Sequence, residues 1–152
     1  MRSFLPQAFA LLGCTAPCFA ADLVASGDWT QQLNAAHLVS GAGSNLPTQI
    51  QSLAGTTILS ISNAPGAWTL RVRRAGGPWP GNVTLFVKRT SAGAGSGSVS
   101  GGDAFVEVTG SDTELFSGSG ARSNIALQFK LTGLSTSVSP AQYLSSIIFT
   151  VQ

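Results

Sequence analysis

The chain contains few cysteines and few charged residues, and each shortage argues against a class of function. Its 152 residues include 2 cysteines, Cys14 and Cys18, both close to the N-terminus. Charged residues make up 9% of the chain, with 8 Lys+Arg against 6 Asp+Glu. This near-neutral balance argues against nucleic acid or an anionic membrane surface as the partner.

The sequence also lacks the motifs of common catalytic sites. There is one histidine, His37, and no Ser-His-Asp or Cys-His set can be built around it by spacing. No G-x-S-x-G, H-E-x-x-H, P-loop or dinucleotide-binding glycine pattern occurs. We therefore expect a protein that is not an enzyme and that uses no cofactor, and we interpret His37 as a surface or turn residue.

The start of the chain has the layout of a secretory signal peptide, which we assign to residues 1–20. Arg2 supplies a short cationic region, an apolar segment follows, and small residues at Cys18 and Ala20 favour cleavage before Ala21. The apolar segment is far too short to span a membrane. We expect an exported bacterial protein, located in the periplasm, at the cell surface or outside the cell.

The same segment has a second interpretation. Residues 11–14 (Leu-Leu-Gly-Cys) resemble a bacterial lipobox, which would leave Cys14 as a lipid-bearing N-terminus. Cleavage before Ala21 instead removes both cysteines, so that the mature protein has no disulfide. Residues 21–152 are enough for a single domain with a hydrophobic core.

Alternation of apolar and polar residues predicts an all-β fold. The clearest alternation occurs at residues 57–61, 68–73, 83–88, 125–131 and 147–151. Shorter strands are expected at residues 29–33, 104–109 and 114–117, and the Gly/Ser/Ala-rich residues 91–102 are expected to form a mobile connection. No sustained helical period follows the signal segment. The pattern predicts an immunoglobulin-like Greek-key β-sandwich of about eight strands.

The chain ends in an apolar strand that we regard as a candidate assembly strand. Tyr143, Ile147, Phe149 and Val151 are expected to share one of its faces. From Tyr143 onward there is neither a charged residue nor a proline, which are devices that natural proteins use to protect an edge strand. The strand is therefore predicted to invite pairing with another strand.

A group of aromatic and basic residues allows two interpretations. Trp68, Arg71, Arg73 and Trp79 could form a platform for sugar rings, in which arginine and tryptophan stack. Alternatively, Trp68 belongs to the core, the arginines face solvent, and Trp79 packs flat on their stems. We favour the second interpretation.

Four carboxylates lie close together in the sequence, at Asp103, Glu107, Asp112 and Glu114. Carboxylates at such spacing can bind calcium through oxygen ligands, and a pair can hydrolyse glycosides. Because Asp112 and Glu114 follow Gly-Ser in a turn-like segment, we favour solvated turn residues, and calcium at Asp103, Asp112 and Glu114 is left as an alternative.

The C-terminal segment resembles a known family. The ending Tyr-x-x-x-Ile-Ile-Phe-Thr-Val-Gln, preceded by the turn at residues 137–140, is similar to bacterial fimbrial subunits and spore-coat-U-type secreted proteins. The resemblance implies an immunoglobulin-like fold that lacks one strand and receives it from a neighbour's N-terminal extension.

By that resemblance, the donor segment would lie within residues 21–46 and the acceptor beside the C-terminal strand. The alternative for residues 21–46 is that they complete the protein's own sandwich. The implied function is that of a pilin-like structural subunit of a surface filament or coat, with self-association or other surface subunits as partners. The alternative is a secreted carbohydrate-binding module that recognises glycans through Trp79 and nearby arginines.

Overall fold

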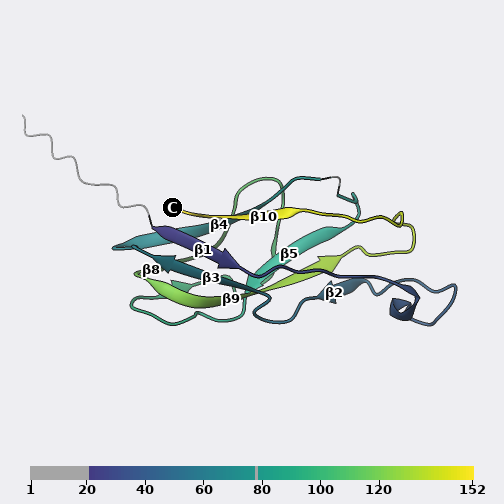
Figure 1. Cartoon of the computed structure of the whole chain (residues 1–152), viewed down its shortest axis with the longest axis horizontal. Helices are drawn as coiled ribbons and strands as arrows, with labels where there is room; N and C mark the ends of the chain where they lie inside the picture. Colours follow the sequence, from purple (N-terminus) through teal and green to yellow (C-terminus); the bar gives the residue numbers. More distant parts are fainter. Residues whose placement is uncertain (1–20, 78) are drawn as a thin grey trace, which may run out of the picture.

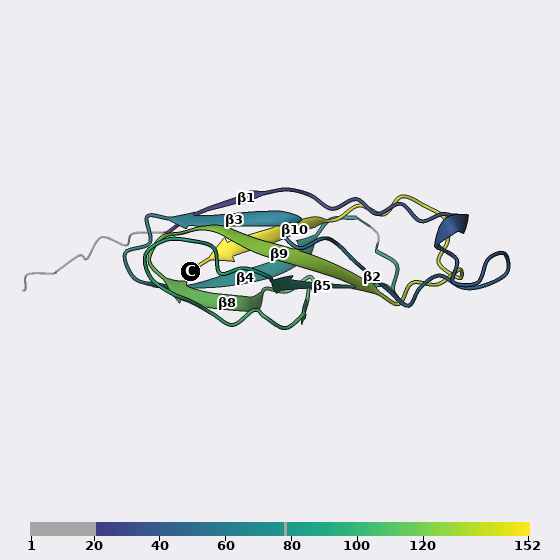
Figure 2. The same ribbon diagram turned by 90° about the horizontal axis from the view of Figure 1, so that it is seen from below.

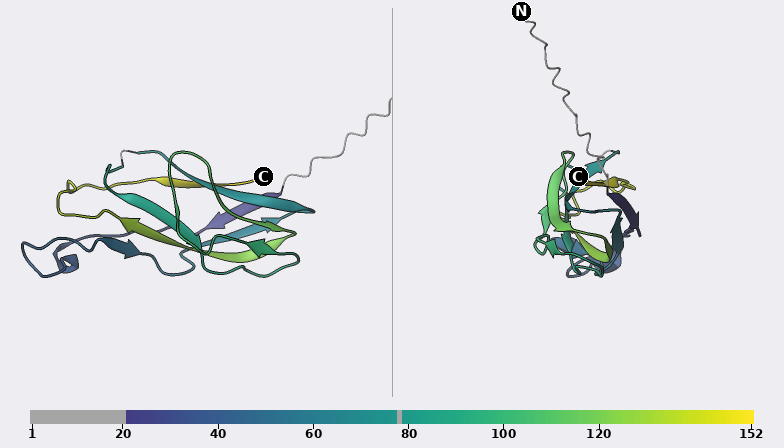
Figure 3. Two further views of the ribbon diagram at one scale, coloured as in Figure 1. Left: turned by 180° about the vertical axis from the view of Figure 1, so that it is seen from behind. Right: turned by 90° about the vertical axis from the view of Figure 1, so that its left-hand side faces the viewer.

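The computed structural model describes residues 21–77 and 79–152. The predicted signal peptide and the alternative lipid site at Cys14 lie outside the described residues. The described chain folds into an elongated all-β molecule. Strand β1 (Asp22–Ser26) begins near the end of strand β10 (Ser146–Val151), and long loops lie at the far end (Figures 1 and 2). Viewed along its long axis, the molecule has a narrow cross-section (Figure 3).

The described residues contain ten strands and one short 3-10 helix. In chain order they are β1 (Asp22–Ser26), η1 (Ala35–His37), β2 (Gln49–Gln51), β3 (Thr57–Ser62), β4 (Ala67–Ala75), β5 (Thr84–Arg89), β6 (Val99–Ser100), β7 (Val106–Glu107), β8 (Thr113–Ser119), β9 (Arg122–Thr132) and β10 (Ser146–Val151). This confirms the all-β class and the five main stretches of alternation.

The strands form two antiparallel sheets. The β1 sheet has the order β1-β3-β9-β5-β7, with β2 also paired to β9. The β10 sheet has the order β10-β4-β8-β6. In the constant-type immunoglobulin sandwich, strands A, B, E and D form one sheet and C, F and G form the other. If β1, β3, β4, β5, β9 and β10 are labelled A to F, the β1 sheet reproduces the A-B-E-D order and the β10 sheet places F beside C.

The core lies between the two sheets and follows from the alternation. On β3, Leu59 and Ile61 are buried while their neighbours are more exposed. On β9, Ile125, Leu127 and Phe129 alternate in the same way. Each fully buried Leu, Ile or Phe side chain stabilises the fold by roughly 1.5–3 kcal/mol relative to exposure. Residues 21–152 contain no cysteine, so burial and backbone pairing hold this part of the chain together.

The predicted strand at residues 29–33 is wrong. The first strand lies earlier, at β1, and the extended pairing ends at Gly27, whose φ is 96°. A Cβ at Gly27 would collide with the carbonyl oxygen of Thr56, so the backbone conformation at this position requires glycine. Beyond it, Trp29 stacks on Phe129 with ring centroids 6.2 Å apart, so packing to the core rather than sheet pairing holds this segment.

The C-terminal strand is shorter than predicted, because β10 begins at Ser146 and leaves Tyr143 outside it. The Tyr143 hydroxyl donates a hydrogen bond to the carbonyl oxygen of Ser139, 2.8 Å away, within the preceding loop. Tyr143 therefore stabilises a turn and does not share a strand face with Ile147, Phe149 and Val151.

One arginine, Arg122, holds the glycine-rich segment that follows β5. Residues 91–102 were expected to form a mobile connection. The Arg122 guanidinium donates to the carbonyl oxygens of Ala92, Gly93, Gly95 and Gly97 at 2.8–3.2 Å. An isolated bridge between Ala94 and Ser123 adds backbone hydrogen bonds. The loop has defined partners because its backbone carbonyls converge on a single charged side chain.

Candidate functional site

The candidate site is the free edge of β10. Within residues 21–77 and 79–152, this strand pairs only with β4. The next residue, Gln152, exchanges two backbone hydrogen bonds with Thr69 of β4, at 2.8 and 3.0 Å. Since hydrogen-bonded pairs alternate along an antiparallel ladder, the N–H and C=O groups of Ile147, Phe149 and Val151 point away from β4, toward the open edge.

The same three residues direct their side chains toward the core. Phe149 lies opposite Val72 and Val151 lies opposite Leu70, and both β4 residues are 0% exposed. In contrast, Ile147, Phe149 and Val151 are only half-buried, although they pack against the core cluster. At this edge the core is thus incompletely covered.

The other long edge strand, β1, lies on the same side of the sandwich. It contacts β10 across the gap between the sheets without pairing to it. Of its five residues only Leu23 is half-buried, and Val24 is 62% exposed. One side of the molecule therefore presents two long sheet edges, which Figures 1 and 3 show beside the two ends of the described chain.

The opposite side of the sandwich is better protected. Its edge strands, β6 and β7, have two residues each. Very short edge strands are a common protection against unwanted pairing. In the immunoglobulin comparison, strand G lies beside F on the side away from C. Within the described residues, no strand occupies that position next to β10.

The predicted sugar platform is not assembled on one surface. Trp68 is 3% exposed, packs edge-on against Phe116 at 6.2 Å, and donates its indole N–H to the carbonyl oxygen of Gly120 at 2.9 Å. Arg71 and Arg73 alternate with buried residues of β4 and project from the opposite face of the sheet. Trp68 therefore belongs to the core, separated from the two arginines by the sheet itself.

Trp79 is also engaged in packing. Its indole N–H donates to the carbonyl oxygen of Val83 at 2.6 Å, and the Arg74 guanidinium lies 4.9 Å from its ring centroid. The half-buried ring packs against the core cluster. One ring face is thus covered by an arginine from the same strand that was expected to supply the platform.

This packing predicts a structural effect for Trp79→Ala. We expect the free energy of unfolding to fall by about 1–3 kcal/mol, less than for a fully buried tryptophan, as measured by urea denaturation. A glycan array compares the same variant with the unmodified protein. Unchanged stability together with loss of a glycan signal would contradict the packing role of Trp79 and support its interpretation as a sugar platform.

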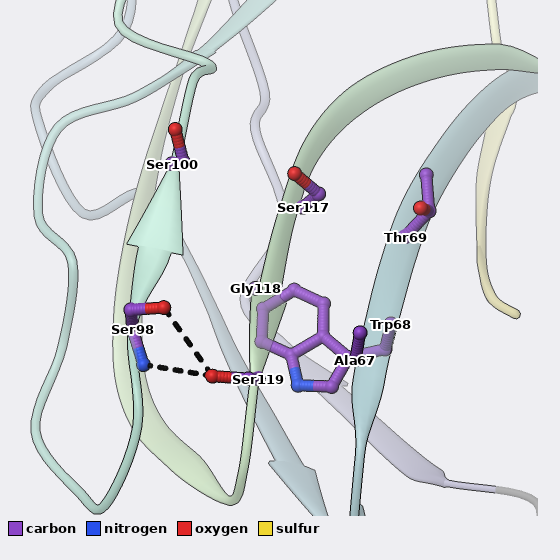
Figure 4. Close-up of a pocket in the computed structure, with 8 residues that line it drawn as sticks. All are labelled: Ala67, Trp68, Thr69, Ser98, Ser100, Ser117, Gly118 and Ser119. Atoms are coloured by element: carbon purple, nitrogen blue, oxygen red, sulfur yellow. Dashed lines mark hydrogen bonds between the residues drawn. The ribbon is translucent and has the colours of Figure 1, made fainter.

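A shallow hollow of about 390 Å³ lies on the outer face of the β10 sheet (Figure 4). Hydroxyl side chains from three strands line it, and Ser98 bonds to Ser119 at 3.3 Å through both its backbone N–H and its hydroxyl. Trp68 contributes to the lining but is buried, so no aromatic ring lies open for stacking there. The hollow offers hydrogen-bonding groups without a charged or nucleophilic set.

The carboxylates predicted near one hairpin are dispersed. Asp103 pairs with Arg89 at 2.6 Å, and Asp112 pairs with Arg73 at 3.4 Å. No group of three or more potential metal ligands gathers among residues 21–77 and 79–152. Calcium therefore gains no support at this hairpin.

His37 caps the short helix η1. Its Nδ1 lies 3.0 Å from the side-chain oxygen of Asn34 and accepts from the Asn34 backbone N–H at 3.4 Å. This places the single histidine in a local turn, where Asn34 engages its Nδ1.

Comparison with protein-family models, with curated proteins and with solved structures finds no match to this chain. In the part of the chain that the structure covers, no helix is long and apolar enough to cross a membrane. The class is therefore defined by fold alone: an antiparallel β-sandwich with one open side. Strand β1 was not predicted as a strand, because its signal in the sequence is only the short apolar run Leu23-Val24-Ala25.

Proposed function

We propose that this protein is an exported structural subunit of a surface filament or coat that assembles by β-strand addition. The acceptor is the free edge of β10, and the donor is the N-terminal segment, residues 21–46, of a neighbouring copy. The observation that carries the proposal is the uncharged, proline-free edge of β10, with three half-buried apolar side chains directed inward.

The acceptor edge has both components that strand addition requires. The outward N–H and C=O groups of Ile147, Phe149 and Val151 supply backbone hydrogen bonds. An added strand would place alternate side chains inward, over the same three residues, and complete their burial. Main-chain bonds then give affinity and the alternating side chains give selectivity.

The donor segment is the least embedded long strand of the fold. In the β1–β3 pairing, Leu23 lies opposite Ile61 and Ala25 opposite Leu59, so β1 directs small or medium apolar side chains inward. Residues 27–48 connect β1 to β2 without another strand. Roughly 20 residues can span up to about 70 Å when extended, enough for β1 to reach an adjacent subunit.

Two further features support this function. The N-terminal sequence favours export, and the described residues hold no group of three or more potential metal ligands. The C-terminal sequence resembles fimbrial subunits, in which an incomplete immunoglobulin-like sandwich is completed by a neighbour. Among residues 21–77 and 79–152, no strand lies beside β10 in the position that strand G takes in the immunoglobulin sandwich.

A reversible disulfide tests the donor. Val24 and Ser60 are opposite one another in the β1–β3 register, and opposite residues of an antiparallel pair lie within the range that a disulfide spans. Without its signal segment the chain has no cysteine. We expect the oxidised Val24→Cys/Ser60→Cys variant to be monomeric in light scattering, because β1 cannot leave its own sheet, and the reduced variant to form multimers. Multimers that persist unchanged in the oxidised protein would exclude β1 as the donor.

The acceptor is tested by a proline at the open edge. Val151→Pro removes an N–H that points away from β4, so it spares the β4–β10 ladder while blocking an added strand. The matched control, Val151→Ala, shortens the side chain and keeps the N–H. Multimers should be lost in Val151→Pro and retained in Val151→Ala. A stable monomer for the unmodified protein at high concentration would overturn the assembly proposal altogether.

A further inference from the structure

Both lysines of the chain, Lys88 and Lys130, lie on one patch of the β1 sheet. The Lys88 ammonium nitrogen is 4.8 Å from the ring centroid of Phe105. The Lys130 ammonium nitrogen is 4.3 Å from the same ring and 4.6 Å from Phe86. We call these four residues the Lys/Phe patch.

The β5–β9 register brings the patch together. Leu85 and Val87 are buried, so Phe86 and Lys88 point to the outer face of β5. Phe86 lies opposite Lys130 on β9. The pairing of β5 with β7 brings the segment just before β7, and with it Phe105, beside Lys88.

Neither ammonium group forms an ion pair with a carboxylate of the described residues. The ion pairs among the described residues join Arg73 to Asp112 and Arg89 to Asp103, and neither lysine takes part. Glu107 lies opposite Phe86 and is exposed, but it forms no ion pair with the patch. Two like charges over one aromatic ring repel each other, so an anion bound between them is favoured.

We propose that the Lys/Phe patch binds an acidic polysaccharide. The two ammonium groups contact carboxylate or sulfate groups on the sugar chain, while the phenylalanine rings hold the ammonium groups in place by cation–π contact. Anionic membranes are usually recognised by clusters of four to eight basic residues, and nucleic acid by many phosphate contacts. A patch with two cations beside two aromatic rings fits a lower charge density. The proposal is independent of strand addition.

The test uses the mature protein with its lysines reductively methylated with carbon-13, which preserves their charge and gives one NMR signal for each. The probes are an oligogalacturonate and a heparin hexasaccharide, with maltohexaose as the uncharged control. We expect both lysine signals to shift with either acidic probe, to be unaffected by maltohexaose, and to return as salt is added. The signal of the methylated N-terminal amine serves as an internal control.

Affinity measurements on variants separate charge from packing. The Lys88→Gln/Lys130→Gln variant replaces both charges with neutral polar groups and should bind the acidic oligosaccharides roughly tenfold more weakly, the combined effect of two partly exposed charge contacts. Lys88→Arg/Lys130→Arg should bind within about threefold of the unmodified protein. Thermal unfolding verifies that both variants are folded.

Three results would overturn the proposal. The first is the absence of lysine shifts with either acidic probe. The second is equal binding by the glutamine variant and the unmodified protein. The third is a response to phosphatidylglycerol vesicles or single-stranded DNA that exceeds the response to the oligosaccharides, which would assign the patch to a different class of partner.

Discussion

Leu127→Ala is expected to lower the free energy of unfolding by about 2–5 kcal/mol. Leu127 is 0% exposed and lies in the middle of β9, the strand that pairs with both β3 and β5. Truncation leaves a cavity between the sheets that strands paired on both sides cannot close by moving inward. Urea denaturation followed by far-UV circular dichroism measures the effect.

The matched control is the next residue, Gln128→Ala. Gln128 points out of the core and donates its side-chain N–H to the carbonyl oxygen of Ser52 at 2.8 Å. Loss of that bond should cost about 1 kcal/mol. Similar losses at Leu127 and Gln128 would mean that the strand does not have one buried and one polar face.

Arg122→Met is expected to reduce stability by about 2–4 kcal/mol, because five donor contacts to backbone carbonyls are lost together and the carbonyls of Ala92, Gly93, Gly95 and Gly97 lose a shared partner. The loop should also open locally. Hydrogen exchange should therefore increase first at residues 92–97 and at the Ala94–Ser123 bridge.

Two variants serve as comparisons for Arg122. Arg122→Lys retains the charge but cannot reach several carbonyls at once, so we expect an intermediate loss. Arg73→Met breaks an exposed ion pair with Asp112 and should cost less than about 1 kcal/mol. If Arg122→Met and Arg73→Met had equal effects, the carbonyl contacts of Arg122 would contribute nothing specific.

The sequence predicts the long central strands well because their signal is local. Strands β3, β4, β5 and β9 alternate buried and less buried residues over five or more positions. A period of two is a direct consequence of the pleat when one face is buried. For the same reason Trp68 could be assigned to the core, since Leu70 and Val72 follow it at the same spacing.

The features of the fold that the sequence did not predict depend on contacts between segments that are far apart in the chain. Strand β1 is mostly exposed and carries little alternation, and it is fixed by pairing with β3 rather than by its own sequence. The Arg122 contacts join residues nearly thirty positions apart, which no local pattern reveals. The Lys/Phe patch likewise arises only when β5, β7 and β9 are placed side by side.

The order of strands in the β1 sheet has a consequence for any assembly. The Lys/Phe patch lies on β5 and β9 and beside β7, whereas β1 occupies the other edge of the same sheet. A filament that grows through β1 and β10 therefore leaves every patch uncovered and repeats it at each subunit. Binding of a long acidic chain to many such patches becomes multivalent, and avidity can exceed single-site affinity by about 10²–10⁴. Adhesion to such a chain would then be set by filament length, without any change in the subunit.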